Sequence, residues 1–199
     1  MRKLLAVLLT ALATGVAADD LPLALPQLYD VVDVADDDHL NVRAAPNAGA
    51  EIIGTLASDA RDIEVTALSR QGNWGQVNVM ERAGWVALRY LAPQSDPAAL
   101  TDLSCFGTEP FWNINFGADQ TILFSTPEQE QVHQITSPLP IAGIGSETFF
   151  GLRFDWIYYT TTSTALILPG QCNDGMSDRR YALQFIDLTG GLRGCCSLG

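Results

Sequence analysis

Apolar and polar residues alternate in short runs along the first half of the chain, and turn-forming residues separate the runs. The clearest run is Leu40-Asn41-Val42-Arg43, which the turn-forming stretch 45–49 follows. A period of two residues is typical of a strand that buries one face. The runs that we expect to form strands are 29–34, 40–43, 52–56, 63–68, 74–79 and 84–88. Short strands at this close spacing predict a small all-β barrel.

The second half of the chain is also rich in strand-like runs. We expect strands at 111–116, 121–125, 132–135, 149–159, 160–168, 181–188 and 192–196, with a break at the proline-containing stretch 137–140. No stretch has a convincing long helical period. Residues 93–100 are rich in Pro, Ala and Ser and have no period, which indicates a linker. The pattern predicts an all-β protein with domains at 29–92 and 101–199.

The first 18 residues have the three parts of a secretory signal peptide. A positive start at Arg2 and Lys3 leads into an apolar run at 4–12 and then small residues. The apolar run is too short to span a bilayer, and no cysteine follows it for lipid attachment. We expect cleavage after Ala17 or Ala18, an extended lead-in at 19–28, and a periplasmic or secreted bacterial protein without a membrane span or lipid anchor.

The four cysteines are expected to form disulfides, because export exposes them to an oxidising compartment. A bond between the neighbours Cys195 and Cys196 would be strained, so we expect each to reach back to Cys105 or Cys172. Adjacent residues on a strand point to opposite faces, which suits two separate partners. We favour Cys172–Cys195 and Cys105–Cys196 over the reverse pairing.

The composition narrows the classes of partner. The chain has 11 basic and 23 acidic residues and a formal net charge of −12. This charge repels phosphate backbones and anionic membrane surfaces, so it argues against a nucleic-acid partner. With 47% hydrophobic and 17% charged residues, the chain has the composition of a globular rather than a disordered protein.

Several motifs in the first domain occur together at the spacing of a known family. They are Leu40–Arg43, Pro46, Ile53–Leu56, Trp74–Val77, Gly84–Val86 and Tyr90-Leu91. Residues 29–92 resemble a bacterial SH3-type (SH3b) domain. The resemblance implies an SH3-like small barrel and a binding module of exported and cell-wall proteins. Some members hold peptidoglycan peptides and others contact proteins, so the ligand is not implied.

The second domain also carries family motifs. They are CFGTEPFW at 105–112, CNDGMSDRRY at 172–181 and GCC at 194–196. These resemble an uncharacterised family of bacterial periplasmic proteins and lipoproteins, and the MSD segment is similar to one in META (heat-shock-lipoprotein-like) domains. Many relatives have Pro after this Tyr, whereas Ala182 follows Tyr181 here. The resemblance implies a β-rich domain and no established activity.

Five residues of the first domain are candidate ligand contacts. Trp74 and Trp85 are expected to fill the core of a small barrel, although an exposed aromatic ring can stack on a ligand. Tyr29, Asn41 and Arg43 are the better candidates for the surface. The Arg43 guanidinium suits a carboxylate, either that of Asp33 or that of a peptide, and we favour the ion pair with Asp33.

In the second domain, Glu109 and Trp112 are the candidate contacts, since an acid beside aromatic rings can grip a sugar or a cation. We favour a structural role for both. The loop 172–181 offers oxygen atoms for Ca²⁺ at Asn173, Asp174 and Asp178 but lacks the calcium-loop pattern, so we read it as a tight structural turn and expect no metal or cofactor.

These observations favour an exported, non-catalytic envelope protein whose SH3b module binds peptidoglycan peptide or an envelope protein. The alternative is a periplasmic hydrolase that acts on envelope material through Ser177 and His133, although no nucleophile-elbow motif is present. A third hypothesis, a metal- or stress-sensing domain, rests on the acidic loop alone.

Overall fold

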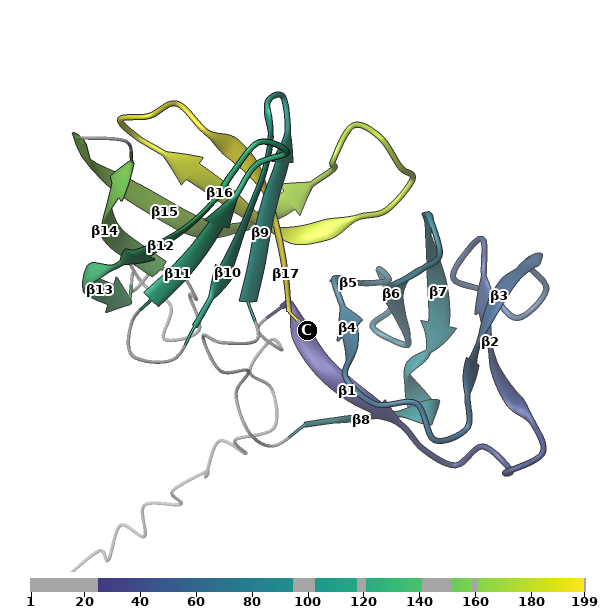
Figure 1. Ribbon diagram of the computed structural model, residues 1–199. Helices are drawn as coiled ribbons and strands as arrows, with labels where there is room; N and C mark the ends of the chain where they lie inside the picture. The colour runs from purple at the N-terminus through teal and green to yellow at the C-terminus, as the bar shows by residue number, and fades with distance from the viewer. Residues whose placement is uncertain (1–24, 95–102, 118–120, 141–151, 159–160, 199) are drawn as a thin grey trace, which may run out of the picture.

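The structure, a computed structural model, describes residues 25–94, 103–117, 121–140, 152–158 and 161–198. These residues are almost entirely strands, which form two β-rich units lying side by side (Figure 1). No helix in the described ranges is long and apolar enough to cross a bilayer. The predicted signal peptide and most of the predicted linker lie outside the described residues, so both stay predictions.

The first unit consists of two sheets that enclose one core. Its elements are β1 (Gln27–Val31), β2 (His39–Arg43), β3 (Ile52–Ala57), β4 (Ile63–Val65), β5 (Ala67–Leu68), β6 (Trp74–Val79), β7 (Arg82–Ala87), the 3-10 turn η2 (Leu88–Tyr90) and β8 (Leu91–Pro93). One sheet has the order β3-β2-β7-β6-β5 and the other the order β4-β1-β8. Strand β1 begins inside the segment that we expected to be an extended lead-in.

Aliphatic side chains and Tyr29, not tryptophans, form the core of this unit. Val77 on β6 and Val86 on β7 are almost completely buried. Because side chains alternate along a strand, Trp74 and Trp85 lie on the opposite face from these valines and are only partly buried. The expectation that both tryptophans fill the core is therefore wrong.

The second unit is one nine-stranded antiparallel sheet that curls into a nearly closed barrel. Its strands are β9 (Leu103–Thr108), β10 (Phe111–Phe116), β11 (Thr121–Ser125), β12 (Glu130–Gln134), β13 (Thr136–Pro140), β14 (Leu152–Tyr158), β15 (Thr161–Cys172), β16 (Tyr181–Asp187) and β17 (Arg193–Leu198). The order is β12-β11-β10-β9-β17-β16-β15-β14-β13. Strand β12 also approaches β14 across the seam. The all-β class with two β-rich units is confirmed.

Two proline-containing stretches are strands where the sequence pattern predicted none. The expected break at 137–140 belongs to β13, which lies at the end of the sheet order. An edge strand tolerates proline because one row of its backbone groups has no ladder partner. Strand β15 continues beyond Leu168 to Cys172, and the pairing register shifts between Pro169 and Cys172. A bulge of this kind accommodates a proline inside a sheet.

The disulfides are Cys105–Cys196 and Cys172–Cys195, which confirms the predicted pairing. No cysteine is free. Cys105 on β9 is the cross-strand neighbour of Cys196 on β17, so this bond joins the first strand of the unit to its last. The second bond fastens β17 to the end of β15, where the 173–180 loop begins.

Glycines on the adjacent strands β9 and β17 leave room for the ring of Trp112, which lies on β10. A methyl group on Gly107 would lie 2.2 Å from Trp112 Nε1, and one on Gly194 would lie 1.9 Å from the Phe106 carbonyl oxygen. Trp112 itself is 4% exposed. Its ring therefore occupies space in the barrel that a larger side chain at either glycine would take.

We predict that Gly194→Ala lowers the free energy of unfolding by about 3 kcal/mol, because the new methyl group clashes with backbone that the β9–β17 pairing holds in place. Urea unfolding of the oxidised protein measures this loss. Gly49→Ala is the control, since its nearest neighbour would be Asn47 Oδ1 at 3.6 Å. Equal stability of Gly194→Ala and the wild type would contradict the close contact.

Candidate functional site

The first unit carries an open groove with a cavity volume of about 570 Å³. The charged, polar and aromatic residues that matter most among those lining it are Asp33, Asp38, Asn41, Arg43, Trp74 and Tyr90. Three of them, Asn41, Arg43 and Trp74, are residues that the sequence singled out. Strand β2 supplies the first two and the start of β6 supplies the tryptophan. The fold thus gathers residues from distant parts of the sequence on one side of the barrel.

Arg43 lines this groove and is partly buried, with one guanidinium nitrogen engaged by the protein. Its Nη1 donates to the Ala50 carbonyl oxygen at 2.8 Å, and no ion pair with Asp33 is found in the described part of the chain. The expected ion pair is therefore wrong, although both residues line the groove. A guanidinium anchored at one nitrogen keeps its remaining N–H groups for a carboxylate ligand.

A second basic residue and an aromatic ring adjoin Arg43 in the same groove. The Arg89 guanidinium carbon lies 4.7 Å from the centroid of the Tyr90 ring, and Nη2 donates to the Tyr90 hydroxyl oxygen at 3.1 Å. Both residues belong to the η2 turn. The cation–π contact and the hydrogen bond hold the Arg89 guanidinium against the Tyr90 ring, beside the cavity.

The groove combines both signs of charge with aromatic surface. Asp33 and Asp38 contribute carboxylates, Arg43 and Arg89 contribute guanidinium groups, and Trp74 offers a partly exposed ring. The residues that line the cavity all come from the first unit, so the second unit does not cover it. This arrangement suits a short peptide that carries carboxylate and amino groups.

Residues 38–92 match the family model of the bacterial SH3 domain. They form an SH3-like domain. Bacterial SH3 domains are a family of cell-wall or protein-binding modules. Neither the curated proteins nor the solved structures that were compared with the chain gave a match. The two disulfides and the SH3 domain are consistent with an extracytoplasmic protein.

Three of the other candidate residues lie away from the groove. Tyr29, on β1, is 2% exposed and packs in the core of the SH3 domain, where burial raises the pKa of its phenol. Trp112 is inside the barrel of the second unit. Trp85 is the cross-strand neighbour of Arg43 but does not line the cavity. Burial places Tyr29 and Trp112 out of reach of a ligand, contrary to their selection as candidates.

Glu109 lines a separate, wide cleft of about 760 Å³ on the second unit. Phe111 and Met176, which are 52% and 68% exposed, also line this cleft. Glu109 and Arg193 give it charges of opposite sign, and the Asp174 carboxylate there is engaged by its own loop. The cleft therefore favours no single class of ligand, and Glu109 stays a proposed contact.

The 173–178 loop is a tight turn held by Asp174. Its Oδ1 accepts hydrogen bonds from the amides of Met176 and Ser177, and its Oδ2 accepts one from Ser177 Oγ at 2.7 Å. Burial raises the pKa of Asp174, but these hydrogen bonds outweigh burial and hold the pKa below its ordinary value. The interpretation of this loop as a structural turn is confirmed. The described residues contain no cluster of three or more metal-ligating side chains.

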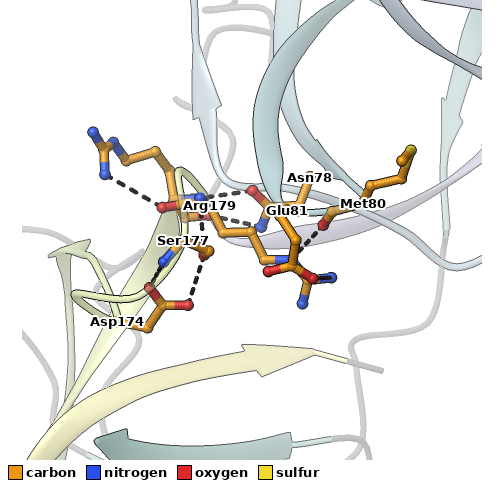
Figure 2. Close-up of polar contacts among 7 residues, drawn as sticks. Asn78, Met80, Glu81, Asp174, Ser177 and Arg179 are labelled. Carbon is orange, nitrogen blue, oxygen red and sulfur yellow. Dashed lines mark hydrogen bonds and ion pairs between the residues drawn. The ribbon is translucent and has the colours of Figure 1, made fainter.

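Residues 178–180, at the end of this loop, bind the SH3 domain (Figure 2). The sequence did not indicate this role. The backbone of Asp178 makes two hydrogen bonds to the β6–β7 turn. The Asp178 carbonyl accepts one from the Ala83 amide at 3.0 Å, and the Asp178 amide donates one to the Glu81 carbonyl at 2.9 Å. Arg179 Nε donates to the Met80 carbonyl at 2.6 Å. We call these contacts of residues 178–180 the clamp.

Asn78 completes the clamp with two hydrogen bonds to one backbone unit. Its Nδ2 donates to the Arg180 carbonyl at 2.9 Å, and its Oδ1 accepts from the Arg180 amide at 3.0 Å. The side-chain amide thus imitates a neighbouring strand. Backbone pairing between segments about 100 residues apart leaves no mark in local sequence, and two adjacent arginines look like ordinary surface residues.

Ser177 and His133, the residues of the hydrolase alternative, contact different neighbours. Ser177 Oγ is engaged with Asp174, whereas His133 lies on β12 with its ring 5.6 Å from that of Trp156. No hydrogen bond joins Ser177 to His133 where both are described. Burial also lowers the pKa of His133. Ser177 and His133 are therefore not arranged as a hydrogen-bonded nucleophile–base pair among the described residues.

We predict that Asn78→Ala raises the hydrogen-exchange rate of the Arg180 amide about tenfold, because the amide loses its acceptor and the clamp opens more often. Amide exchange followed by NMR measures this rate. The exposed Asn115→Ala is the matched control, and we expect it to leave the rate unchanged. An unchanged rate in Asn78→Ala would show that the clamp is not formed in solution.

Proposed function

We propose that this protein is an exported, non-catalytic envelope protein, periplasmic or secreted, whose SH3 domain binds a short peptide in the groove beside Arg43. The observation that carries the proposal is the placement of Asn41, Arg43 and Trp74 in one solvent-open cavity. The domain's family supports a role in binding cell wall or protein. The disulfides favour an oxidising compartment.

The peptide that we favour is the stem peptide of peptidoglycan. Stem peptides carry carboxylate and amino groups on a short extended chain, which complement the groove's guanidinium groups and carboxylates. The carboxylate of the peptide binds the free N–H groups of Arg43, an amino group faces Asp33 or Asp38, and the Trp74 ring covers an apolar part of the chain. A protein partner with an exposed acidic segment is the second form of the same proposal.

In this account the second unit supports the SH3 domain. The clamp holds the β6–β7 turn, and the groove stays open because its lining comes from the SH3 domain alone. The disulfide-joined unit stabilises the SH3 domain from a side away from the groove. Ser177 takes part in this support through its own loop and has no catalytic role in the proposal.

We predict that Arg43→Ala weakens binding of a soluble stem peptide about 30-fold, or about 2 kcal/mol, because a charge-assisted hydrogen-bond pair is lost. Calorimetry on the full mature protein gives the affinity, and co-sedimentation with purified peptidoglycan tests the polymer. Arg61→Ala removes a guanidinium that is outside the groove and 76% exposed, so we expect it to bind as the wild type does.

Absence of binding to both the stem peptide and the polymer would refute the cell-wall form and leave the protein partner. Equal loss of binding in Arg43→Ala and Arg61→Ala would show that general charge, not the groove, attracts the ligand. Release of soluble fragments from the polymer by the wild-type protein would contradict the non-catalytic assignment.

A further inference from the structure

The two units meet at a second contact besides the clamp, on strands β1 and β4 of the SH3 domain. Leu28 on β1 and Glu64 on β4 are direct cross-strand neighbours. Leu28 belongs to the buried cluster of the second unit, whereas Tyr29 next to it belongs to the SH3 core. This pair of strands therefore faces both domains, and Glu64 stands beside Leu28 on the face that meets the second unit.

The Glu64 carboxylate is bound by the end of strand β17. Oε1 accepts a hydrogen bond from the Leu198 amide at 3.0 Å, and Oε2 accepts one from Ser197 Oγ at 3.1 Å. Figure 1 shows β17 running down from the second unit to β1. An acidic side chain of one domain thus sits between backbone and hydroxyl donors of the other, beside an apolar side chain.

The charged groups around Glu64 do not neutralise it. A cavity of about 250 Å³ at this contact is lined from the SH3 side by Asp62, Glu64 and Asn78 and from the second unit by Arg179, Tyr181 and the end of β17. Asp62 has the same sign as Glu64. Arg179 is the one cation in this lining, and its guanidinium is engaged with the Met80 carbonyl and Glu81.

We propose that Glu64 is a pH-sensitive latch between the two domains, which holds them together when its carboxyl is protonated and loosens them when it ionises. The latch rests on the contact of β1 and β4 with β17 and does not depend on what the groove binds.

Burial raises the pKa of Glu64 to about 7 from an ordinary value of 4.5, and the hydrogen bonds from Leu198 and Ser197 lower it only in part. Separation of the domains returns Glu64 to water and therefore to the ordinary pKa. Between these two values the docked form binds the proton that the separated form has lost. Docking is consequently strongest below about pH 4.5 and weakens as the pH rises to about 7, where the docked carboxyl ionises.

Tyr181, which lines the contact, and Asp174, whose charge acts on Tyr181, do not produce the same response. Burial raises the pKa of Tyr181 from 10.0, so its phenol stays neutral between pH 5 and 8. The pKa of Asp174 is lowered from 3.8, so this group stays ionised over the same range. The groove lies outside the contact, because no residue of the β17 end lines it. The latch thus changes the orientation of the SH3 domain without covering its binding surface.

NMR of the oxidised, full mature protein tests the latch in three ways. The side-chain carboxyl of Glu64 reports its own titration, the exchange of the Leu198 amide (corrected for intrinsic pH dependence) reports docking, and residual dipolar couplings report whether the domains share one orientation. We expect a Glu64 midpoint near pH 7 and a docking equilibrium that weakens by up to about 300-fold from low to high pH.

Glu64→Gln keeps the shape and removes the charge, so we expect docking that no longer weakens with rising pH. Glu51→Gln changes an exposed acid of the same domain and should keep the wild-type response. Leu28→Ala should loosen docking at every pH and leave the pH dependence in place. Titration of Glu64 near 4.5 with the Leu198 amide protected throughout would overturn the latch. The same pH response in Glu64→Gln and the wild type would also overturn it.

Discussion

Four consecutive residues at the end of strand β17 connect the barrel, its 173–180 loop and the SH3 domain. Cys196 bonds to Cys105 and joins the last strand of the barrel to the first. Cys195 bonds to Cys172 and fastens the loop that carries the clamp. Ser197 and Leu198 donate hydrogen bonds to Glu64 of the SH3 domain. Barrel closure, loop position and domain contact therefore all depend on the register of one strand.

The SH3 domain uses its surfaces for different purposes. Strands β1, β4 and the β6–β7 turn face the second unit, whereas the groove with Arg43 and Trp74 stays open. The core makes this division possible, because aliphatic side chains and Tyr29 fill it without a tryptophan and leave Trp74 on the outer face. A binding module anchored on one side and open on another can present its ligand site in a defined direction.

Local patterns in the sequence predicted the parts of the structure that local physics determines. Strand alternation located β2, β6, β10 and β11. The opposed faces of Cys195 and Cys196 indicated two separate disulfide partners, but the local pattern did not decide between the two possible pairings. The prolines of β13 were misleading because a strand at the edge of a sheet tolerates them, a position that only the tertiary structure reveals.

The candidate site was predicted in part for a similar reason. Asn41, Arg43 and Trp74 meet in the groove, but Tyr29 and Trp112 are buried, because aromatic residues suit a ligand surface and a core equally well. The contacts of Glu64 and Asn78 with the second unit depend on segments more than 100 residues away, so no local pattern announces them. The structure, not the sequence, therefore shows how the two domains contact each other.

We propose that a peptide binds in the open groove while the second unit supports the SH3 domain from another side. Amide chemical-shift mapping of the full mature protein during titration with a stem peptide tests this most directly. We expect the shifts to be concentrated at Asn41, Arg43, Trp74 and Tyr90, with the amides of the clamp unchanged. Shifts concentrated at the clamp or around Glu109 and Phe111, with the groove silent, would contradict it.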